Sequence, residues 1–222
     1  MEKRETRTGH MESVQQKIIT ASKELFLTQG YRKTTIQQIV KRSGVTSGSI
    51  YHIYGNKEKI FQATADYVIK QVFEHVDEKF AGETPIFRLA ANLSLELLLI
   101  ADDPIVREIY YEALTSDYLF ERAVGLHIGI AARLLPEAVE ANARARHVLI
   151  FCGAMRAYIV SLSFADRTAL STAALQRELL GLALSHLGLP ALARGDLLRR
   201  IEAAQGELLA ICHDVLTTTK KE

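Results

Sequence analysis

Apolar residues recur at helical spacing along almost the whole chain. The first stripe consists of Val14, Ile18, Ala21 and Leu25. Because positions three or four residues apart share one face of a helix, this stripe predicts an amphipathic helix that ends at Gly30. No segment of convincing length alternates apolar and polar residues as a half-buried strand does. The pattern therefore predicts an all-α fold.

Three more helices are expected directly after this one. Thr34 and Thr35 offer an N-cap for the second helix, and Asn56 offers one for the fourth. The expected helices are a short one that stops near Gly44, a short one over 45–54 and a long one from 57 to about 80.

Prolines divide the remainder of the chain. Thr84-Pro85 and Asp103-Pro104 each place a capping residue before a proline suited to the first helical turn, and Pro136 and Pro190 mark further breaks. The expected helices cover 85–101, 103–115, 117–134, 137–164, 168–187 and 196–217. Glycine is sparse, with 13 in 222 residues, which agrees with a helical class.

The cysteines and the lack of long apolar runs indicate the cellular compartment to expect. Cys152 and Cys212 lie in apolar helical patterns and form no C-x-x-C pair, which argues against a zinc site or a disulfide framework and favours a reducing compartment. The N-terminus lacks the apolar core of a secretion signal. The longest apolar stretch, 148–164, is interrupted by Arg156 and is shorter than the roughly 20 residues of a membrane span. We expect a soluble, cytoplasmic protein without a membrane partner.

Charge is distributed unevenly along the chain. Residues 1–60 carry eleven Lys and Arg against five Asp and Glu, a net charge of +6, whereas the remainder carries 16 against 21, a net charge of −5. A basic front on an acidic body suggests that the front meets a polyanion such as DNA. A solvated charged face is the alternative, and charge alone does not separate the two.

Residues 34–57 have the layout of a helix-turn-helix. Two short helices are joined by a Ser43-Gly44-Val45 turn, and a second helix of this kind fits the DNA major groove. Gly48 lets the backbone approach DNA closely, and Lys57 lies in the first turn of the next helix, where a cation and free N–H groups can hold a phosphate. The short or hydrogen-bonding side chains expected on the exposed face of the second helix are Thr46, Ser47, Ser49, Tyr51 and His52.

The run from Leu25 to Phe61 resembles the DNA-binding domain of the TetR/AcrR family of bacterial transcriptional regulators. The matching features, in register without a gap, are Leu25-Phe26, Gly30-Tyr31, Thr34-Thr35, Ile39, Gly44-Val45, Gly48, Ile50-Tyr51 and Asn56-Lys57-Glu58. The resemblance implies a basic flexible tail over 1–12, a three-helix DNA-binding domain over 13–58 joined by the helix 57–80, and a helical ligand-binding and dimerisation domain over 59–222.

The resemblance also implies roles for single residues. Thr35 and Lys57 correspond to phosphate contacts, Tyr51 to the phosphate-binding tyrosine, and Gln37 to a base-reading position. Ser47, Gly48 and Ser49 occupy the base-facing start of the recognition helix, with Thr46 just before them and His52 as a mixed contact. Ser47 stands where the family often has lysine and Ile53 where it often has a polar residue, which removes two potential DNA contacts. The alternative for Tyr51 and His52 is packing within the three-helix unit.

Candidate ligand-binding residues are spread over the C-terminal body. They are Tyr110, Tyr111, His127, Phe151, Arg156 and Tyr158. Aromatic residues at helical spacing are also common in an ordinary core. Arg156 interrupts an apolar helix, and a buried arginine needs a partner. An internal salt bridge to a carboxylate such as Glu108 or Glu112 is favoured over an anionic ligand.

Together these features predict a ligand-responsive, sequence-specific transcriptional regulator. We expect a repressor that binds double-stranded DNA at a palindromic operator as a homodimer and that an unknown small-molecule effector releases. The candidate helices for the dimer interface are 137–164 and 168–187, and the apolar stripe of 196–217 makes it a further candidate. We expect no cofactor, no metal site and no enzymatic activity, because none of the common catalytic motifs occurs. The alternative is an all-helical enzyme or a carrier of lipids or other small molecules with an apolar cavity.

Overall fold

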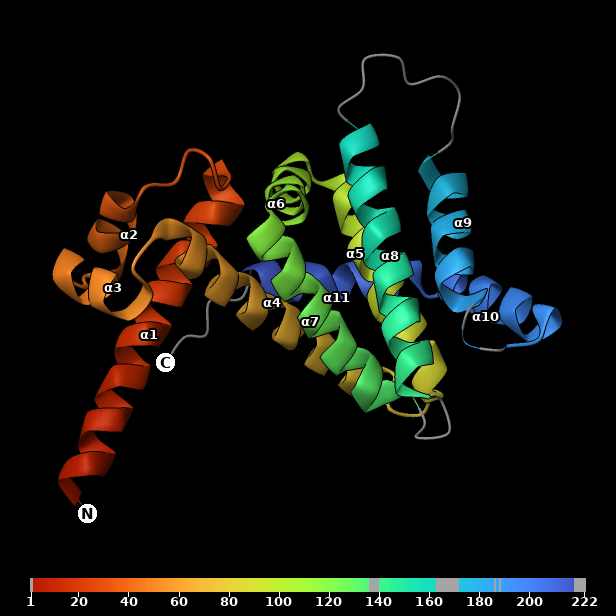
Figure 1. Ribbon diagram of the computed structural model, residues 1–222, viewed down its shortest axis with the longest axis horizontal. Coiled ribbons are helices and arrows are strands. Elements are labelled where there is room, and N and C mark those ends of the chain that lie inside the picture. Colours follow the sequence, from red (N-terminus) through yellow and green to blue (C-terminus); the bar gives the residue numbers. More distant parts are fainter. Residues whose placement is uncertain (1, 136–139, 163–171, 186, 188, 218–222) are drawn as a thin grey trace. The chain divides into compact units, whose positions relative to one another are not determined.

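The computed structural model describes residues 2–135, 140–162, 172–185, 187 and 189–217. Within these residues the chain forms eleven α-helices and no strand (Figure 1), which confirms the predicted all-α class. The helices are α1 (Glu2–Gln29), α2 (Ile36–Ser43), α3 (Ser47–Tyr54), α4 (Lys57–Lys79), α5 (Pro85–Asp102), α6 (Pro104–Thr115), α7 (Asp117–Leu134), α8 (Ala141–Ser161), α9 (Thr172–Ser185), α10 (Ala191–Ala203) and α11 (Gln205–Thr217). None of these helices is long and apolar enough to cross a membrane.

The chain divides into two compact units. The N-terminal unit extends to Ile69, and the C-terminal unit begins at Lys70. The boundary falls inside α4, one continuous helix, whereas the sequence placed the domain boundary between residues 58 and 59. The first three turns of α4 therefore belong to the N-terminal unit and its last turns to the C-terminal unit.

Helix starts follow the capping residues predicted from sequence. The N–H of Phe87 donates to Thr84 Oγ1 at 3.3 Å, and the N–H groups of Ile105 and Val106 donate to Asp103 Oδ1 at 2.7 and 3.1 Å. Asn56 Oδ1 accepts from the N–H of Lys59 at 2.9 Å. These bonds satisfy N–H groups that lack a partner within the helix. Short polar side chains thus fix where α4, α5 and α6 begin.

Three segments differ from the sequence prediction. Residues 2–12, expected as a tail, are the first three turns of α1: they contain helix-forming Glu, Lys and Arg but no apolar stripe to reveal them. The expected helix 196–217 is two helices, α10 and α11, which meet at Ala204. Gly206 lies two residues after this break, but the apolar stripe from Leu197 to Val215 continues across it, so the pattern predicted a single helix. The expected helices 137–164 and 168–187 correspond to α8 and α9. Of their other residues, Glu140, Leu162 and Leu187 are described and are not helical, and the rest lie outside the described part of the chain.

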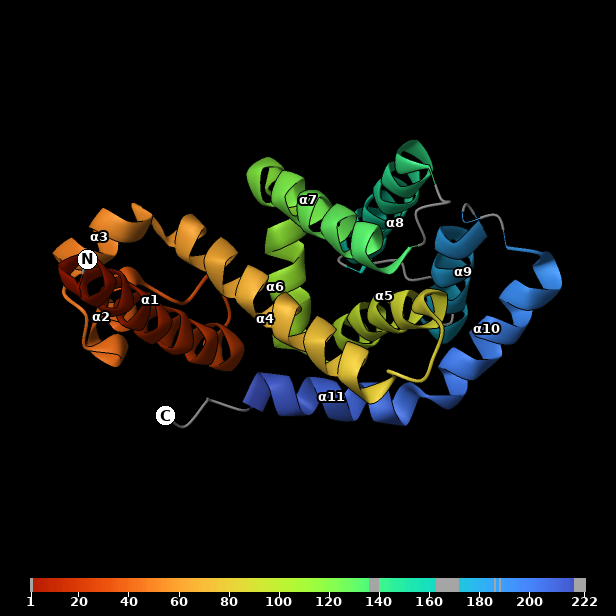
Figure 2. The ribbon, with the colours of Figure 1, turned by 90° about the horizontal axis from the view of Figure 1, so that it is seen from below.

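The core of the N-terminal unit is built on aromatic rings. Phe26 of α1 meets Phe61 of α4 edge to face, with ring centroids 5.4 Å apart, and the Tyr31 ring lies 4.6 Å from Phe61. Ile39 of α2 and Ile50 of α3 are almost completely buried. Burial of these side chains holds the three helices α1, α2 and α3 against the first turns of α4 (Figure 2).

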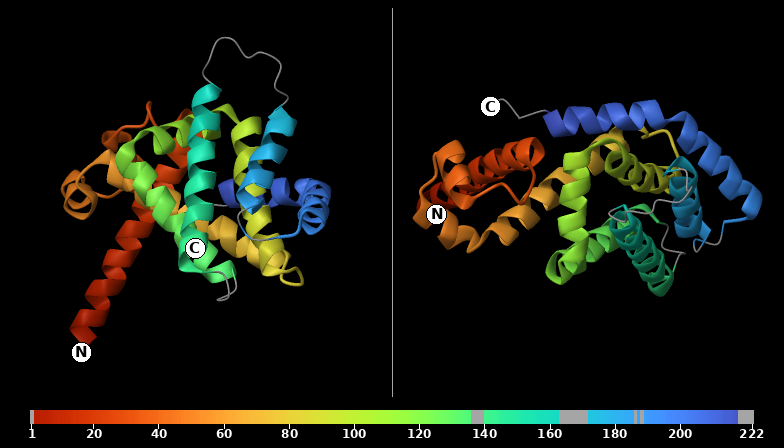
Figure 3. Two further views of the ribbon diagram at one scale, coloured as in Figure 1. Left: turned by 45° about the vertical axis from the view of Figure 1, so that its right-hand side comes forward. Right: turned by 90° about the horizontal axis from the view of Figure 1, so that it is seen from above.

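Helix α5 is the central helix of the C-terminal unit. It packs against α6, α7, α9, α10 and α11, and these helices surround it in Figure 3. Residues on all sides of α5 are buried, from Phe87 through Ile100. A helix that is apolar all round is expected in the interior. One acidic residue of α5, Glu96, is buried with them at 8% exposure.

Candidate functional site

The turn between α2 and α3 needs a glycine. Gly44 has φ of 69°, in the left-handed region that side chains other than glycine rarely adopt, and its N–H donates to the carbonyl of Val40 at 3.0 Å. Val45 then enters the core, and Thr46 begins α3. The two short helices and the tight turn predicted from residues 34–57 are therefore present.

One face of α3 is open to solvent and carries no formal charge. Tyr51 is 53% exposed, and Thr46, Ser47, Gly48 and His52 are exposed as well. Ser49 is half-buried, and Ile50 is the residue of α3 that enters the core. A Cβ added at Gly48 would meet no atom of the chain within 4 Å. Packing inside the protein therefore does not require this glycine, and the exposed face of α3 offers hydrogen-bonding groups without a bulky side chain at its start.

Thr46, a candidate DNA contact, also caps α3 through a bond to Ser49, another candidate. The N–H of Ser49 donates to Thr46 Oγ1 at 3.3 Å, and the two hydroxyl oxygens lie 2.9 Å apart. The sequence analysis gave Thr46 and Ser49 only a role toward DNA. A threonine directly before the first helical residue could have predicted this capping role.

Thr35 fixes the start of α2 through a reciprocal pair of bonds. Its Oγ1 accepts from the N–H of Gln38 at 3.2 Å, and its own N–H donates to Gln38 Oε1 at 2.8 Å. This arrangement is a capping box. Gln37, the other candidate contact of α2, is exposed. Thr35 directly precedes α2, and Gln37 is the second residue of the helix.

We predict that Thr35→Ala lowers the free energy of unfolding by about 1 kcal/mol, because the N–H of Gln38 loses its acceptor. Urea unfolding followed by circular dichroism measures this effect. Thr35→Ser keeps the oxygen and should leave stability within about 0.5 kcal/mol of the natural chain. Equal losses in the two variants would contradict a capping role.

Lys57 points toward the connection between α1 and α2. Its Nζ donates to the carbonyl oxygens of Tyr31 and Thr34, both at 3.0 Å, and lies 4.1 Å from the centroid of the Tyr31 ring. The side chain is partly buried. Lys57 therefore ties the first turn of α4 to the turn before α2, a structural contact that the sequence analysis did not predict.

Basic side chains are exposed around these helices. Arg42 of α2 forms an ion pair with Glu24 of α1 at 2.5 Å. The other exposed cations between residues 30 and 60 are Arg32, Lys33, Lys41 and Lys59. Exposed positive charge of this kind favours contact with phosphate. The charge excess predicted for the front of the chain is thus present on its surface.

A buried ion pair lies at the centre of the C-terminal unit. His127 of α7 and Glu96 of α5 are each 8% exposed, and His127 Nε2 donates to Glu96 Oε1 at 2.9 Å. His127 Nδ1 lies 2.8 Å from the carbonyl oxygen of Ala123. Because both ring nitrogens face acceptors, and only the protonated imidazole has two N–H donors, His127 is an imidazolium. Desolvation lowers its pKa, but the Glu96 charge and the bonds to Glu96 and Ala123 outweigh it and raise the pKa to about 9.

Other titratable groups gather around the same carboxylate. The Tyr110 hydroxyl of α6 bonds to Glu96, and burial together with the Glu96 charge raises the pKa of Tyr110 well above its usual value. Burial and the same charge raise the pKa of Cys152 on α8 and of Cys212 on α11 to about 12. We call Glu96, Tyr110 and His127 the buried polar centre. Glu96 is the member that the sequence analysis missed.

The remaining candidate ligand residues are divided between this centre and the surface. The Phe151 ring lies 5.9 Å from the His127 ring, which brings two predicted residues together. Tyr158 is buried on α8, and Tyr111 is half-buried on α6. A cavity beside the buried polar centre is lined by Leu93, His127, Phe151 and neighbouring residues. Its volume is only about 10 Å³.

Arg156 forms an internal salt bridge as expected, but its partner is not one of the two carboxylates given as examples. Its side chain is 38% exposed, and its ion-pair partner is Asp117 at 3.4 Å, instead of Glu108 or Glu112. The guanidinium also lies 4.9 Å from the centroid of the Phe120 ring. The long arginine stem lets the charged group leave the apolar face of α8, so that a buried partner is unnecessary.

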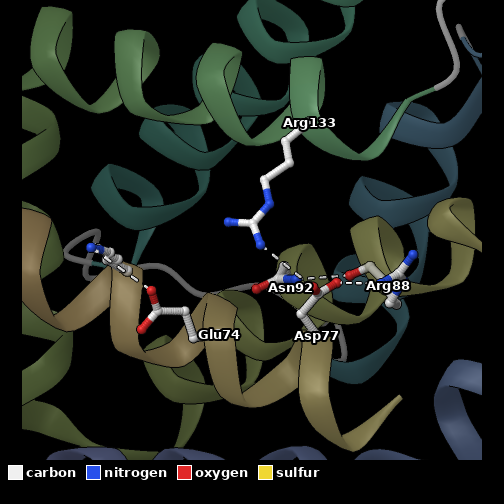
Figure 4. Close-up of polar contacts among 6 residues, drawn as sticks. Glu74, Asp77, Arg88, Asn92 and Arg133 are labelled. Atoms are coloured by element: carbon white, nitrogen blue, oxygen red, sulfur yellow. Dashed lines mark hydrogen bonds and ion pairs between the residues drawn. The ribbon is translucent and has the colours of Figure 1, made fainter. Parts of the chain in front are cut away.

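The last turns of α4 are held by charged side chains from α5 and α7. Asp77 of α4 accepts a hydrogen bond from Arg88 Nη1 at 2.5 Å and forms an ion pair with Arg133 Nη2 at 3.6 Å. Figure 4 shows Asp77 between the two guanidinium groups. The Arg133 group also lies 4.7 Å from the centroid of the Phe73 ring. We call Asp77, Arg88 and Arg133 the α4 clamp.

The buried polar centre predicts a pH dependence of stability. The pKa of His127 is about 9 in the folded chain against an ordinary value of 6.5. The stabilisation is therefore fully present below pH 6.5 and is lost as the pH rises toward about 9. We expect the free energy of unfolding to fall by about 3 kcal/mol over this interval, measured by urea titration at several pH values. His127→Gln should flatten that decline, and an unchanged decline in this variant would contradict the assignment.

Comparison with known proteins places the N-terminal unit in a family. Residues 18–64 match the sequence model of "Bacterial regulatory proteins, tetR family". The chain is 35% identical over 80 residues to the HTH-type transcriptional regulator HbdR of Aromatoleum sp. (strain CIB), a match that covers 36% of this chain and 35% of that protein. It is 32% identical over 63 residues to the HTH-type transcriptional repressor AcnR of Corynebacterium efficiens, covering 28% of this chain and 34% of that protein. The chain thus matches about a third of the length of these curated relatives.

A likeness of fold extends over most of the chain. The crystal structure of RolR in complex with resorcinol superposes with a TM-score of 0.67 at 17% identity, covering 87% of this chain and 96% of that one. The two-part fold of an N-terminal helix-turn-helix unit and a C-terminal helical unit is therefore shared with that protein. The match to the tetR family of bacterial regulatory proteins covers residues 18–64, and over the rest of the chain the likeness is one of fold alone.

Proposed function

We propose that this protein is a sequence-specific DNA-binding transcriptional regulator whose affinity for DNA changes when a small molecule binds its C-terminal unit. The observation that carries the proposal is the exposed, uncharged, hydrogen-bonding face of α3 in a helix-turn-helix that the family model matches. Such a face can read base edges in the major groove. The relatives HbdR and AcnR are named as a transcriptional regulator and a transcriptional repressor, which favours repression here too.

Roles toward DNA follow from position on the helix-turn-helix. Ser47, Gly48 and Ser49 begin α3 and would face base edges, with Thr46 before them and His52 one turn later. Tyr51 and Thr35 would hold phosphates through their hydroxyls. Gln37 is exposed on α2 and long enough to reach a base. Base contacts specify the sequence, whereas phosphate contacts position the protein.

The proposal is tested by retention of genomic DNA fragments on the purified protein. We expect a small set of fragments to survive washing at rising salt, because specific binding exceeds nonspecific binding by about 10³ or more. Gln37→Ala and Ser47→Ala should change which fragments are retained while leaving the total amount similar. Retention that falls equally for all sequences as salt rises would overturn the proposal.

A useful operator requires two recognition helices. One α3 reads only a few base pairs, so two copies about 34 Å apart would read a palindrome as a two-fold homodimer. Exposed leucines on two helices support an interface there: Leu149 of α8 is 54% exposed and Leu182 of α9 is 46% exposed. Apolar side chains exposed on neighbouring helices favour burial against a second copy.

We predict that light scattering gives twice the 24.7 kDa chain mass at micromolar concentration. Leu149→Glu combined with Leu182→Glu should shift the mass toward one chain, since each substitution places a charge in the buried contact. Leu192→Glu is the matched control, because Leu192 is 83% exposed on α10. A natural chain that remains monomeric and binds DNA as one copy per site would contradict the dimer.

Response to a small molecule has a route through α4. This helix is continuous from Lys57 to Lys79, and the α4 clamp holds its last turns. A ligand that binds two arrangements of the clamp with different affinities would shift the helix between them. A typical coupling of 1 to 3 kcal/mol corresponds to roughly 5- to 150-fold in DNA affinity. That the structure of RolR contains resorcinol supports small-molecule binding in a fold of this kind.

A further inference from the structure

We infer that the effector site is the cavity between α5, α9 and α10, and that its ligand is a small, neutral, amphipathic molecule with an apolar body and one hydrogen-bonding head. The inference rests on the proposed function and deepens it. It moves the site away from Tyr110, His127 and Phe151, which the sequence analysis favoured. We call this space the α5–α9–α10 cavity.

Size separates the two candidate sites. The α5–α9–α10 cavity has a volume of about 320 Å³, whereas the cavity beside the buried polar centre has a volume of about 10 Å³. Cavities that hold small molecules have roughly 300 to 1,000 Å³. The space beside the polar centre has room for about one water. The larger cavity can therefore accept an organic molecule without prior rearrangement of the core.

The lining of the α5–α9–α10 cavity is apolar with a few polar groups. The apolar lining residues are Leu97, Leu98, Leu180, Leu198 and Ile201. Ser94 of α5 also lines the cavity and is 6% exposed. A hydroxyl at an apolar wall can serve one polar group of a ligand. This combination fits a molecule with an apolar body and a single polar head.

Charge at the cavity favours a neutral ligand. Arg177 of α9 and Glu202 of α10 both line it, and they pair with each other at 2.7 Å. The Gln176 amide donates to the carbonyl of Leu97 at 2.6 Å. A carboxylate or an amine in the ligand would have to displace one partner of the ion pair and leave the other uncompensated. A neutral molecule leaves the pair intact.

Two of the helices that line the cavity, α5 and α10, also hold the end of α4. Arg200 of α10, next to Ile201 of the lining, bonds to Glu83 just after α4 and lies 4.9 Å from the Phe87 ring of α5. Lys79, the last residue of α4, pairs with Glu207 of α11 at 3.0 Å. Arg88, which holds Asp77 in the α4 clamp, stands on α5, two turns before Ser94. A ligand between α5 and α10 therefore lies between two of the attachments of α4.

Binding at this place can be coupled to DNA. A molecule that fills the cavity fixes the spacing of α5 and α10, and hence the spacing of Arg88 and Arg200, which hold Asp77 and Glu83 at the end of α4. If the DNA-bound form of α4 needs another spacing, the ligand and DNA compete by linkage. Reciprocity then requires that DNA binding lowers the affinity for the ligand by the same factor.

The probe for the site is N-phenyl-1-naphthylamine, a neutral molecule with an apolar body and one N–H group that fluoresces in apolar surroundings. We expect saturable binding to the full-length protein, competed by 1-octanol and much less by octanoate or octylammonium at equal concentration. Leu198→Trp fills the cavity and should lower the affinity for the probe by about tenfold or more. A tenfold loss corresponds to about 1.4 kcal/mol of binding free energy. Leu192→Trp on the same helix is the matched control and should bind as the natural chain does.

A second variant guards against a folding defect. Ser94→Ala keeps the cavity and removes the hydroxyl, so the affinity for 1-octanol should fall by about fivefold to tenfold. Unchanged affinity in both Leu198→Trp and Ser94→Ala, or the absence of saturable binding to the natural chain, overturns the inference. Stronger competition by octanoate than by 1-octanol overturns the assignment of a neutral ligand.

The regulatory part is tested on the genomic fragment that the protein retains most strongly. We expect 1-octanol to change affinity for this fragment by at least about fivefold in the natural chain and in Leu192→Trp, and to have no effect in Leu198→Trp. Binding of 1-octanol that leaves DNA affinity unchanged overturns the effector role. A protein that retains no fragment specifically overturns the proposed function instead, and the probe measurement still decides whether the cavity binds a neutral ligand.

Discussion

Replacing Glu96 with alanine is expected to lower the free energy of unfolding by about 3–5 kcal/mol. The substitution leaves the His127 imidazolium at 8% exposure without its counter-charge, and it removes the acceptor of the Tyr110 hydroxyl. Urea unfolding near pH 6 measures the loss. Asp117→Ala is the matched control, because Asp117 is 96% exposed in its pair with Arg156 and should change stability by less than about 1 kcal/mol.

A double variant distinguishes the cost of an unpaired buried charge from the cost of lost packing. Glu96→Leu together with His127→Leu replaces both charges with apolar side chains, and such replacements of a buried pair are often neutral or stabilising. We therefore expect the double variant to recover most of the stability that Glu96→Ala loses. A double variant as unstable as the single one would show that the cost comes from packing and not from an unpaired charge.

Local sequence was sufficient to predict the helix-turn-helix and several helix starts. The turn at Gly44 follows from the conformational freedom of one glycine, and the start of α2 follows from a threonine with a glutamine three residues later. The caps of α5 and α6 are single residues before prolines. Each of these features is decided within about one helical turn, so a linear pattern contains the information.

Contacts between distant residues could not be predicted in this way. Glu96 stands in an otherwise apolar helix, and its partners come from α6 and α7, so nothing near it in the sequence shows that it is paired. Lys57 was assigned to phosphate alone, since its bonds to the carbonyls of Tyr31 and Thr34 join residues more than twenty positions apart. The break at Ala204 does not interrupt the apolar stripe from Leu197 to Val215. These features depend on which helices meet.

The position of the open cavity was missed for the same reason. Aromatic residues drew attention to α6, α7 and α8, where Tyr110, His127 and Phe151 do gather, but they fill the space around them. The α5–α9–α10 cavity is lined mostly by leucines, which look like ordinary core in a sequence. A cavity forms where packed helices leave space between their side chains, and residue type alone does not reveal where this happens.

Lys57→Ala and Tyr51→Phe are expected to weaken DNA binding on every sequence tested, because phosphate contacts are independent of sequence. Tyr51 is 53% exposed, so removal of its hydroxyl should leave the fold unchanged and weaken the complex by about fivefold or more. For Lys57→Ala, the slope of log affinity against log salt should fall by about one for each subunit on the DNA.

The structure adds a requirement to the Lys57 experiment. Its Nζ also donates to Tyr31 and Thr34 at 3.0 Å, so Lys57→Ala should lower the free energy of unfolding by about 1–3 kcal/mol as well. DNA affinity must therefore be measured well below the unfolding midpoint of the variant. Lys59→Ala, an exposed lysine two residues later, controls for loss of charge in the same turn. A salt slope that is unchanged in Lys57→Ala, with stability reduced, would assign Lys57 to the fold alone, and Tyr51→Phe would then decide whether this end of the helix-turn-helix touches phosphate.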